Sequence, residues 1–184
     1  DILCVTIDNE RAGYDATKYL IGKGRKRIGL LTTEERSMSS VDRENGYKRA
    51  LEDSGLGVDE SLIYHGGYDA ESGTRGCEKL MSLPNPPDAI FSISDTISIG
   101  AMTYALSHGI SVGKDVLFFG FDNIAYSHMF LPHLSTVEQP CYLQGKAVIE
   151  KLIANIKSED GTKDNETYKL PHRLILREST GDGN

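Results

Sequence analysis

The regular alternation of short apolar runs with longer helical patterns is the feature that most limits how this chain can fold. Five apolar runs are expected to form strands, at residues 2–7, 27–32, 62–64, 89–93 and 116–121. The patterns between them are expected to form helices, at residues 12–20, 40–54, 70–82 and 95–108. Strands that alternate with helices of this length predict an α/β fold, in which right-handed crossovers build a parallel sheet.

The C-terminal part of the chain departs from this alternation. A long amphipathic helix is expected from about residue 140 to residue 157. Its apolar stripe consists of Val148, Ile149, Leu152, Ile153 and Ile156. A charged stretch (158–167) then leads to one extended segment (168–177), and we expect the tail from residue 180 onward to be frayed.

Composition and charge are those of an ordinary soluble domain. Hydrophobic residues make up 39% and charged residues 26%, and the formal net charge of -7 disfavours direct binding to a phosphate backbone. The cysteines (Cys4, Cys77 and Cys141) are widely spaced and odd in number, which favours reduced cytosolic thiols over a disulfide framework or a zinc site. No apolar run approaches the roughly eighteen residues needed to cross a membrane, so we expect a cytoplasmic protein without a membrane partner.

Unusual polar or aromatic residues follow four of the expected strands. These residues are Arg43, Tyr68, Ser94, Asp95, Asp122 and Asn123. The carboxyl ends of parallel strands lie along one edge of the sheet, and ligands bind in the crevice outside that edge. We therefore expect these residues to converge on one small-molecule site.

Arg43 is the strongest single candidate. It is expected in the first turn of its helix, on the same inward face as Tyr47 and Ala50. A cation at that place opposes the helix dipole and needs a partner when it is desolvated, which indicates an acceptor across a crevice. The alternative is an arginine at the rim of the site that extends its head group into water.

Asp122 follows a strand whose apolar run suggests burial on both faces. A carboxylate there can accept two hydroxyl hydrogen bonds from a ligand, or pair with Arg43 when the site is empty. The alternative is an Asx-turn, or an N-cap of the short helix expected after Asn123. The two roles can coexist.

Three further residues are candidates for ligand contacts. Tyr68 follows two glycines, and its ring can lie against a sugar or a base, unless it packs as a staple against the next helix. Ser94 can offer its hydroxyl to a ligand, although capping the following helix is the simpler role. Gln139, between an expected strand and Pro140, can supply a polar contact.

Motifs for catalysis or metal binding do not occur in this sequence. No GxGxxG follows the first strand, the run GKGRKR lacks the Walker spacing, and no GxSxG turn is present. The histidines are scattered, and His65, which ends an expected strand, is more often a structural residue than a base. We therefore expect a protein that is not an enzyme and that uses no metal and no cofactor.

Taken in order, the motifs resemble the effector-binding domain of the lactose-repressor/galactose-repressor (LacI/GalR) family of bacterial transcription regulators. The resemblance rests on the segments VTIDN, YLIGKGRKRIGLLT, RENGYKRAL, GGYDAESG, PPDAIFSISDTISIGA, HGISVGKDVLFFGFDN, PHLSTVEQP and LPHRLILREST. Together they cover nearly the whole chain. The resemblance implies the parallel-sheet, Rossmann-like lobe of a two-lobed, type I periplasmic-binding-protein-like domain, with the effector held between the lobes.

The resemblance also implies roles for the candidate residues. Arg43 and Asp122 would bind polar groups of the effector, Tyr68 would line the cleft, and Gln139 lies near a further contact position. Ser94 stands where many members carry Asn. Its shorter hydroxyl offers no amide fork, so this contact is expected to differ from that of the family.

The residue types at these positions indicate the kind of effector that is expected. A mixed set of donors and acceptors beside one aromatic ring favours a neutral sugar, with a purine or nucleoside as the alternative. A sugar phosphate would need a denser basic cluster. The loop 34–40 varies in the family, and we expect Arg36 or Ser39 within it to help set specificity.

By the same comparison the chain is expected to be an incomplete effector-binding domain. Residues 9–136 would form the C-terminal lobe, residues 137–167 a return helix of the N-terminal lobe, and residues 168–177 the final crossover strand. The DNA-binding domain and most of the N-terminal lobe would precede Asp1, which lies at an apolar strand. The apolar stripe of the return helix would then lose partner surface, which favours a homodimer or helix swapping.

Three functions fit this fold. The first is the effector-sensing part of a repressor, in which the effector shifts the lobes and thereby the heads that bind operator DNA. The second is a sugar-binding receptor of a transport system, which would need an export signal that this sequence does not contain. The third is an enzyme on a Rossmann-like sheet, for which a nucleophile and a base are missing. We favour the first.

Overall fold

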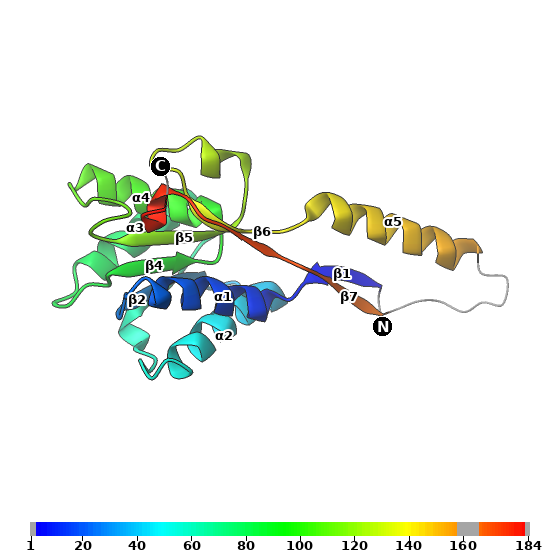
Figure 1. The fold of residues 1–184 in the computed structure, drawn as a ribbon, viewed down its shortest axis with the longest axis horizontal. Coiled ribbons are helices and arrows are strands. Elements are labelled where there is room, and N and C mark those ends of the chain that lie inside the picture. Colours follow the sequence, from blue (N-terminus) through cyan, green and yellow to red (C-terminus); the bar gives the residue numbers. More distant parts are fainter. Residues whose placement is uncertain (1–2, 158–165, 183–184) are drawn as a thin grey trace.

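The computed structural model describes residues 3–157 and 166–182, and its centre is a six-stranded sheet (Figure 1). The strands lie in the order β3-β2-β4-β5-β6-β8. Neighbouring strands are parallel except for β6 and β8, which are antiparallel. The bounds are β2 Ile28–Thr33, β3 Ile63–Gly66, β4 Ala89–Ser92, β5 Leu117–Asp122, β6 Ser135–Glu138 and β8 Arg173–Ile175. The predicted parallel α/β sheet is confirmed.

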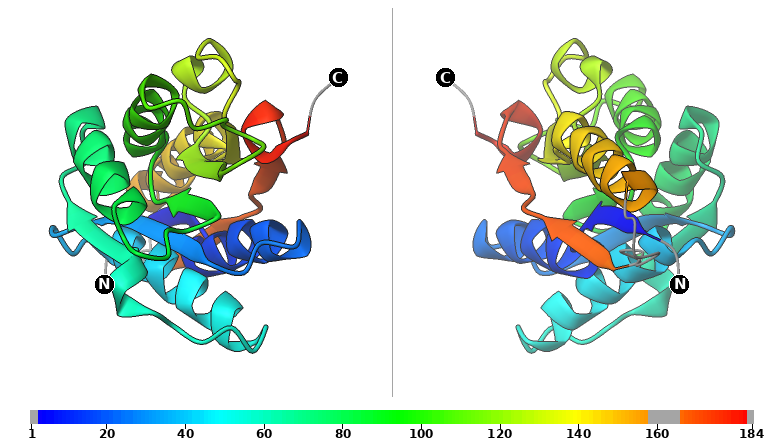
Figure 2. Two further views of the ribbon diagram at one scale, coloured as in Figure 1. Left: turned by 90° about the vertical axis from the view of Figure 1, so that its left-hand side faces the viewer. Right: turned by 90° about the vertical axis from the view of Figure 1, so that its right-hand side faces the viewer.

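Four helices cover the two faces of this sheet (Figures 1 and 2). Helices α1 and α2 pack together on one face, and α3 and α4 pack together on the other. The bounds are α1 Asn9–Gly22, α2 Met38–Glu52, α3 Ala70–Met81 and α4 Asp95–Ser107. Ser37, Asp69 and Ser94 cap α2, α3 and α4, because each side-chain oxygen accepts a backbone N–H of the first turn.

A second, two-stranded parallel sheet lies apart from the first. In it β1 (Cys4–Ile7) pairs with β7 (Thr167–Leu170), and α5 (Cys141–Lys157) contacts β1. Figure 1 shows these elements projecting beyond the end of β6. No residue of α5 is buried. Short 3-10 helices are η1 Glu60–Leu62, η2 Ala125–His128 and η3 Glu178–Thr180.

Two predictions about element boundaries are corrected. Helix α2 begins at Met38, so Arg43 lies in its second turn and not in its first, which weakens the conflict with the helix dipole. The segment 168–177 is not one strand, because Pro171 and His172 separate β7 from β8 and the two strands belong to different sheets. Proline has no N–H to donate to a ladder, so a break at this point is reasonable.

The tail that the sequence predicts to be frayed is anchored as far as Asp182. Thr180 is buried, and its hydroxyl lies 2.6 Å from the hydroxyl of Ser135. The carboxylate of Asp182 contacts both the Tyr19 hydroxyl and the Lys23 ammonium group. Residues 1–2, 158–165 and 183–184 lie outside the described residues, and with them most of the charged stretch.

One boundary of the predicted division into lobes can be compared with the secondary structure. A boundary after residue 136 falls inside β6, since Ser135–Glu138 form a single strand of the six-stranded sheet. The antiparallel strand β8 adds residues 173–175 to the same sheet. The division itself stays a prediction.

Helices α1 and α2 approach each other closely at two glycines. A Cβ atom on Gly46 would lie 2.1 Å from the carbonyl oxygen of Glu10. A Cβ atom on Gly13 would lie 2.5 Å from the carbonyl oxygen of Arg43. This backbone contact sets the position of α2, and hence of Arg43, against α1.

We expect Gly46→Ala to lower the free energy of unfolding by about 1–3 kcal/mol, because the added methyl group overpacks this contact. Gly145→Ala in α5 is the matched control, since nothing lies within 4 Å of a Cβ atom there and alanine favours a helix. Urea denaturation followed by circular dichroism measures both variants. Equal effects of the two substitutions would contradict the close contact.

Candidate functional site

The guanidinium group of Arg43 is buried at the carboxyl end of the sheet, and only 7% of the residue is exposed. Its Nε donates to Asn9 Oδ1 (2.9 Å), and its Nη1 donates to the carbonyl oxygen of Ile93 (2.7 Å). The cation also lies over the ring of Phe121, 3.6 Å from the ring centroid. The alternative of an arginine that extends into water at the rim is therefore wrong.

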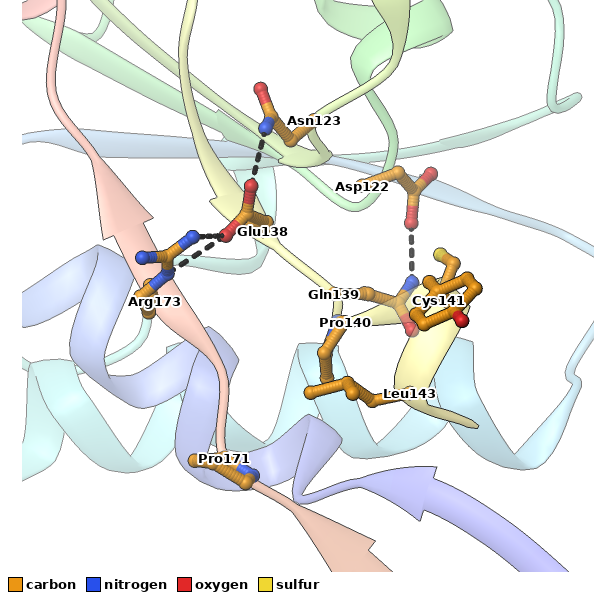
Figure 3. A pocket seen from close by; sticks show the side chains of 10 residues that line it. Asp122, Asn123, Glu138, Gln139, Pro140, Cys141, Leu143, Pro171 and Arg173 are labelled. Carbon is orange, nitrogen blue, oxygen red and sulfur yellow. Dashed lines mark hydrogen bonds and ion pairs between the residues drawn. The ribbon is translucent and has the colours of Figure 1, made fainter. Parts of the chain in front are cut away.

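Asp122 lies between Arg43 and Gln139. Arg43 Nη1 is 3.5 Å from Asp122 Oδ1. Gln139 Nε2 donates to the same oxygen at 2.7 Å (Figure 3). Burial raises the pKa of Asp122, while the charge of Arg43 and the Gln139 hydrogen bond oppose this rise. Asp122 does not cap the following helix, because Ile124 is the N-cap residue of η2 and no side chain caps it. A helix, a strand and a linker thus meet at one carboxylate.

The backbone that carries Asp122 is held in an unusual conformation. Asp122 and Asn123 have φ angles of 112° and 55°, which residues other than glycine adopt at a cost. The side chain of Asn123 donates to Glu138 Oε1 (2.9 Å) and accepts from Arg177 Nη2 (2.7 Å). Glu138 in turn pairs with Arg173 across β6 and β8 (Figure 3). These contacts support the strained turn.

Two hollows open near this edge of the sheet. The larger one has a volume of about 670 Å³ and is lined by Asp122, Asn123, Glu138, Gln139, Pro140, Cys141, Tyr142, Leu143, Pro171 and Arg173. The other has a volume of about 570 Å³ and is lined by Thr33, Glu34, Glu35, Tyr64, His65, Gly66, Gly67, Tyr68 and Arg75. The structure therefore brings Arg43, Asp122 and Gln139 together through contacts with Asp122. Asp122 and Gln139 line the larger hollow, Tyr68 lines the other, and Arg43 lines neither.

The remaining candidates lie at the starts of helices. Tyr68 precedes α3 and is 40% exposed, so a ligand can reach its ring. Ser94 is 6% exposed, and its hydroxyl accepts the N–H of Thr96, which is the capping role. Ser39 lies in the first turn of α2, with its Oγ 3.2 Å from Ser37 Oγ, and the preceding Arg36 is exposed.

Two residues at the site were not recognised from the sequence. Asn9 accepts the hydrogen bond of Arg43 Nε, and Phe121 supplies the ring below the cation. Asn9 could have been found, because it follows Asp8, the N-cap residue of α1, at the end of an apolar run. Phe121 could not, because an aromatic residue in an apolar strand looks like any other core residue.

Asp95 is fully buried at the start of α4. Its Oδ1 accepts the hydroxyl of Thr136 (2.6 Å), and its Oδ2 accepts the N–H of Ile124 (2.9 Å). Burial raises the pKa of Asp95 to about 7, although these two hydrogen bonds lower it. The charge of Asp122 adds to the rise and that of Arg177 opposes it.

Within residues 3–157 and 166–182 no group of three or more His, Cys, Asp or Glu side chains is placed to hold a metal ion. In that same part of the chain, no helix combines the length and the apolar character needed to cross a membrane. Cys4, Cys77 and Cys141 are free thiols.

We expect the contribution of Asp95 to the stability of the protein to fall as the pH rises from about 4 through about 7. The folded-state pKa of Asp95 (about 7) lies above the ordinary value of 3.8, so the folded state binds this proton more tightly than the unfolded state does. The slope from this group is at most about 1.4 kcal/mol per pH unit.

Denaturation midpoints of the wild type and of Asp95→Asn between pH 5 and pH 8 measure this contribution. Asparagine does not titrate, so the difference between the two proteins removes the contributions of the histidines and of most other groups. The expected result is a stability difference that changes with pH. A difference that stays constant over the range would contradict the raised pKa.

Comparison with known proteins identifies relatives over most of the chain. Residues 17–180 match the family model of the periplasmic binding protein-like domain. Catabolite control protein A of Priestia megaterium is 39% identical over 177 residues, which are 96% of this chain and 53% of that protein. The transcriptional repressor CytR of Escherichia coli K12 is 36% identical over 176 residues, which are 96% of this chain and 51% of that protein.

Solved structures agree with these relatives. A regulatory protein of the LacI family from Chloroflexus aggregans has a TM-score of 0.90 and 33% identity, with 98% of this chain and 64% of that chain covered. The regulator CelR in complex with cellobiose has a TM-score of 0.89 and 30% identity, with 97% and 54% covered. The chain spans about half the length of the curated relatives that it matches. It therefore belongs to the periplasmic binding protein-like domain family, and it is similar to regulators of the LacI family over the part of their chains that it spans.

Proposed function

We propose that this chain is the effector-binding part of a LacI-type regulator, and that the effector binds beside Arg43, Asp122 and Gln139. The observation that carries the proposal is a buried cation facing a carboxylate at the sheet edge where ligands of open parallel sheets bind. Their separation of 3.5 Å exceeds that of a charge-assisted hydrogen bond, about 2.7–2.9 Å. Each group therefore keeps hydrogen-bonding capacity for a ligand.

The charges around the two hollows favour a neutral effector. The larger hollow contains two carboxylates, Asp122 and Glu138, and one guanidinium group, that of Arg173. The other contains the carboxylates of Glu34 and Glu35 and the guanidinium group of Arg75. With Arg43 beside Asp122 the charges at the larger hollow balance, and the other hollow has an excess of negative charge, so neither offers the excess of positive charge that would attract an anion such as a sugar phosphate.

A neutral sugar is the effector class that best fits these groups. Its hydroxyls can donate to Asp122 and accept from Arg43 and Gln139. The CelR relative was solved with cellobiose, which makes this disaccharide a suitable first probe. A purine or nucleoside is the second candidate, because Tyr68 exposes a ring on which a base can stack.

We assign DNA binding to a part of the regulator outside this chain. The net charge of -7 gives this segment no electrostatic attraction for operator DNA. In this proposal the effector changes the relative orientation of two lobes, and with it that of the DNA-binding heads. The protein acts in the cytoplasm and catalyses no reaction. The regulators among its relatives favour this role over that of a transport receptor.

The small sheet and α5 support the proposed division into lobes. Strands β1 and β7 form a pair on their own, and isolated pairs of strands are marginally stable in water. The predicted stripe of α5 is accessible, with Ile149, Leu152, Ile153 and Ile156 exposed. We propose that residues 137–167 belong to a second lobe, that residues 168–177 return from it to the first, and that the chain forms a homodimer.

We expect Arg43→Ala and Asp122→Asn each to weaken binding of the effector by at least about tenfold, because each removes a hydrogen bond to a charged group. Calorimetric titration with cellobiose, then with other neutral sugars and nucleosides, measures the affinity. Arg25→Ala is the matched control. Its guanidinium group is bound to the carbonyl oxygens of Lys114 and Asp115, away from the two hollows.

Two results would contradict the proposed site. One is binding by the Arg43 and Asp122 variants with the affinity of the wild type. The other is a wild-type protein that binds glucose 6-phosphate and none of the neutral compounds, because the charge argument predicts the opposite order.

We expect the chain to sediment as a homodimer, and Ile153→Glu to raise the dissociation constant by about tenfold or more, because burying one isoleucine contributes about 1.5–3 kcal/mol. Lys146→Glu is the control, since it changes charge on the same helix outside the apolar stripe. Analytical ultracentrifugation measures both. A wild-type monomer at high concentration would disprove the dimer.

A further inference from the structure

Asp95 connects three elements beneath the proposed effector site. It lies at the start of α4, and its two oxygens accept hydrogen bonds from Thr136 on β6 and from the backbone of Ile124 after β5. Arg43 lines neither hollow but is 7% exposed, whereas Asp95 also lines neither and is completely buried. A ligand in the hollows would therefore not touch it, and the role of Asp95 has to be sought in what it holds.

The carboxylate of Asp95 packs against the backbone of β5 at Gly120, where no side chain is present. A Cβ atom on residue 120 would lie 2.2 Å from Asp95 Oδ1, so only glycine can stand there without displacing the carboxylate. Gly120 is paired with Thr136 on the neighbouring strand. The carboxylate thus reaches across β5 to the hydroxyl of β6.

Asp95 is connected to both peptide N–H groups that follow Asp122, to one directly and to the other through the hydroxyl of Thr136. The N–H of Ile124 donates to Asp95 directly, at 2.9 Å. The N–H of Asn123 donates to Thr136 Oγ1 at 3.3 Å, and this hydroxyl donates to Asp95 at 2.6 Å. Asp122 and Asn123 are the two residues other than glycine with positive φ in the described part of the chain. Such conformations persist where the surroundings hold them.

We propose that Asp95 is a positioning residue of the effector site, which holds the turn at Asp122 and Asn123 so that the Asp122 carboxylate faces Arg43 and Gln139. Glu138 and Arg177 also hold this turn, through the side chain of Asn123. They cannot take over the role of Asp95, because neither of them accepts the backbone N–H of Asn123 or of Ile124. The inference rests on the proposed function only in calling this carboxylate a ligand group.

The electrostatic cost of Asp95 agrees with this role. Burial raises its pKa to about 7, so the ionised carboxylate makes the folded state less stable at neutral pH. A purely structural contact could be made by a neutral side chain without this cost. The ionised group accepts two hydrogen bonds at once, which the geometry of the turn requires.

Nuclear magnetic resonance of the full chain tests the inference without any effector. Backbone chemical shifts report the φ angles of Asp122 and Asn123, and amide exchange reports how firmly the Asn123 and Ile124 N–H groups are held. Thr136→Val removes the hydroxyl with almost no change in shape. We expect amide exchange of both residues to become at least about tenfold faster, and the positive φ of Asp122 to be lost.

Two controls separate this effect from general loosening of the fold. Thr136→Ser keeps the hydroxyl and is expected to behave as the wild type. Thr17→Val removes another fully buried threonine hydroxyl, which donates to the Gly13 carbonyl oxygen within α1, and is expected to leave the turn unchanged. Exchange rates and φ angles in Thr136→Val that equal those of the wild type would overturn the inference.

If Thr136→Val does not fold, Asp95→Asn takes its place, because the amide offers one acceptor oxygen where the carboxylate offers two. At least one of the two N–H groups should then exchange faster, and unchanged exchange of both would again overturn the inference. Cellobiose is added to the same wild-type sample afterwards. A failure of cellobiose to shift any signal counts against the sugar proposal, while the exchange data still decide the role of Asp95.

Discussion

The burial of the Arg43 guanidinium group is the interaction on which the arrangement of the site depends. A cation removed from water is tolerated only where acceptors surround it. Here they come from Asn9 on α1, from the carbonyl group of Ile93 after β4 and from Asp122 at the end of β5. The helix that carries Arg43 therefore has one position in which these acceptors can be reached, and the close contact of α1 with α2 at Gly46 secures it.

Much of the fold could be predicted because each element shows its buried face in the periodicity of its own residues. Contacts between distant parts of the chain could not. The tail is anchored by Tyr19 and Lys23, which hold Asp182 from the other end of the sequence. The break at Pro171 separates strands of two sheets, and no local pattern shows which sheet a strand joins.

The site, like the fold, could be predicted where local residue patterns reveal it and not where it depends on contacts between distant parts of the chain. Polar residues at strand ends identified Arg43, Asp122 and Gln139, which are in contact in the structure. Whether these residues bind an effector stays a proposal. The place of Tyr68 depends on strand order: it follows β3 at one side of the sheet, whereas Asp122 ends β5 and Gln139 follows β6 at the other. Strand order is set by packing between helices and sheet, and the sequence pattern does not contain it.

Resonances of the Arg43 guanidinium Nε–H and of the Gln139 side-chain amide test the central claim most directly. The Arg43 Nε–H donates to Asn9 and the Gln139 amide donates to Asp122. An effector that binds at this site must change the surroundings of both groups. During a titration with cellobiose or another neutral sugar, the account predicts that both signals shift with one dissociation constant while Arg25 Nε–H stays in place. Saturable binding that leaves both signals unmoved would contradict it.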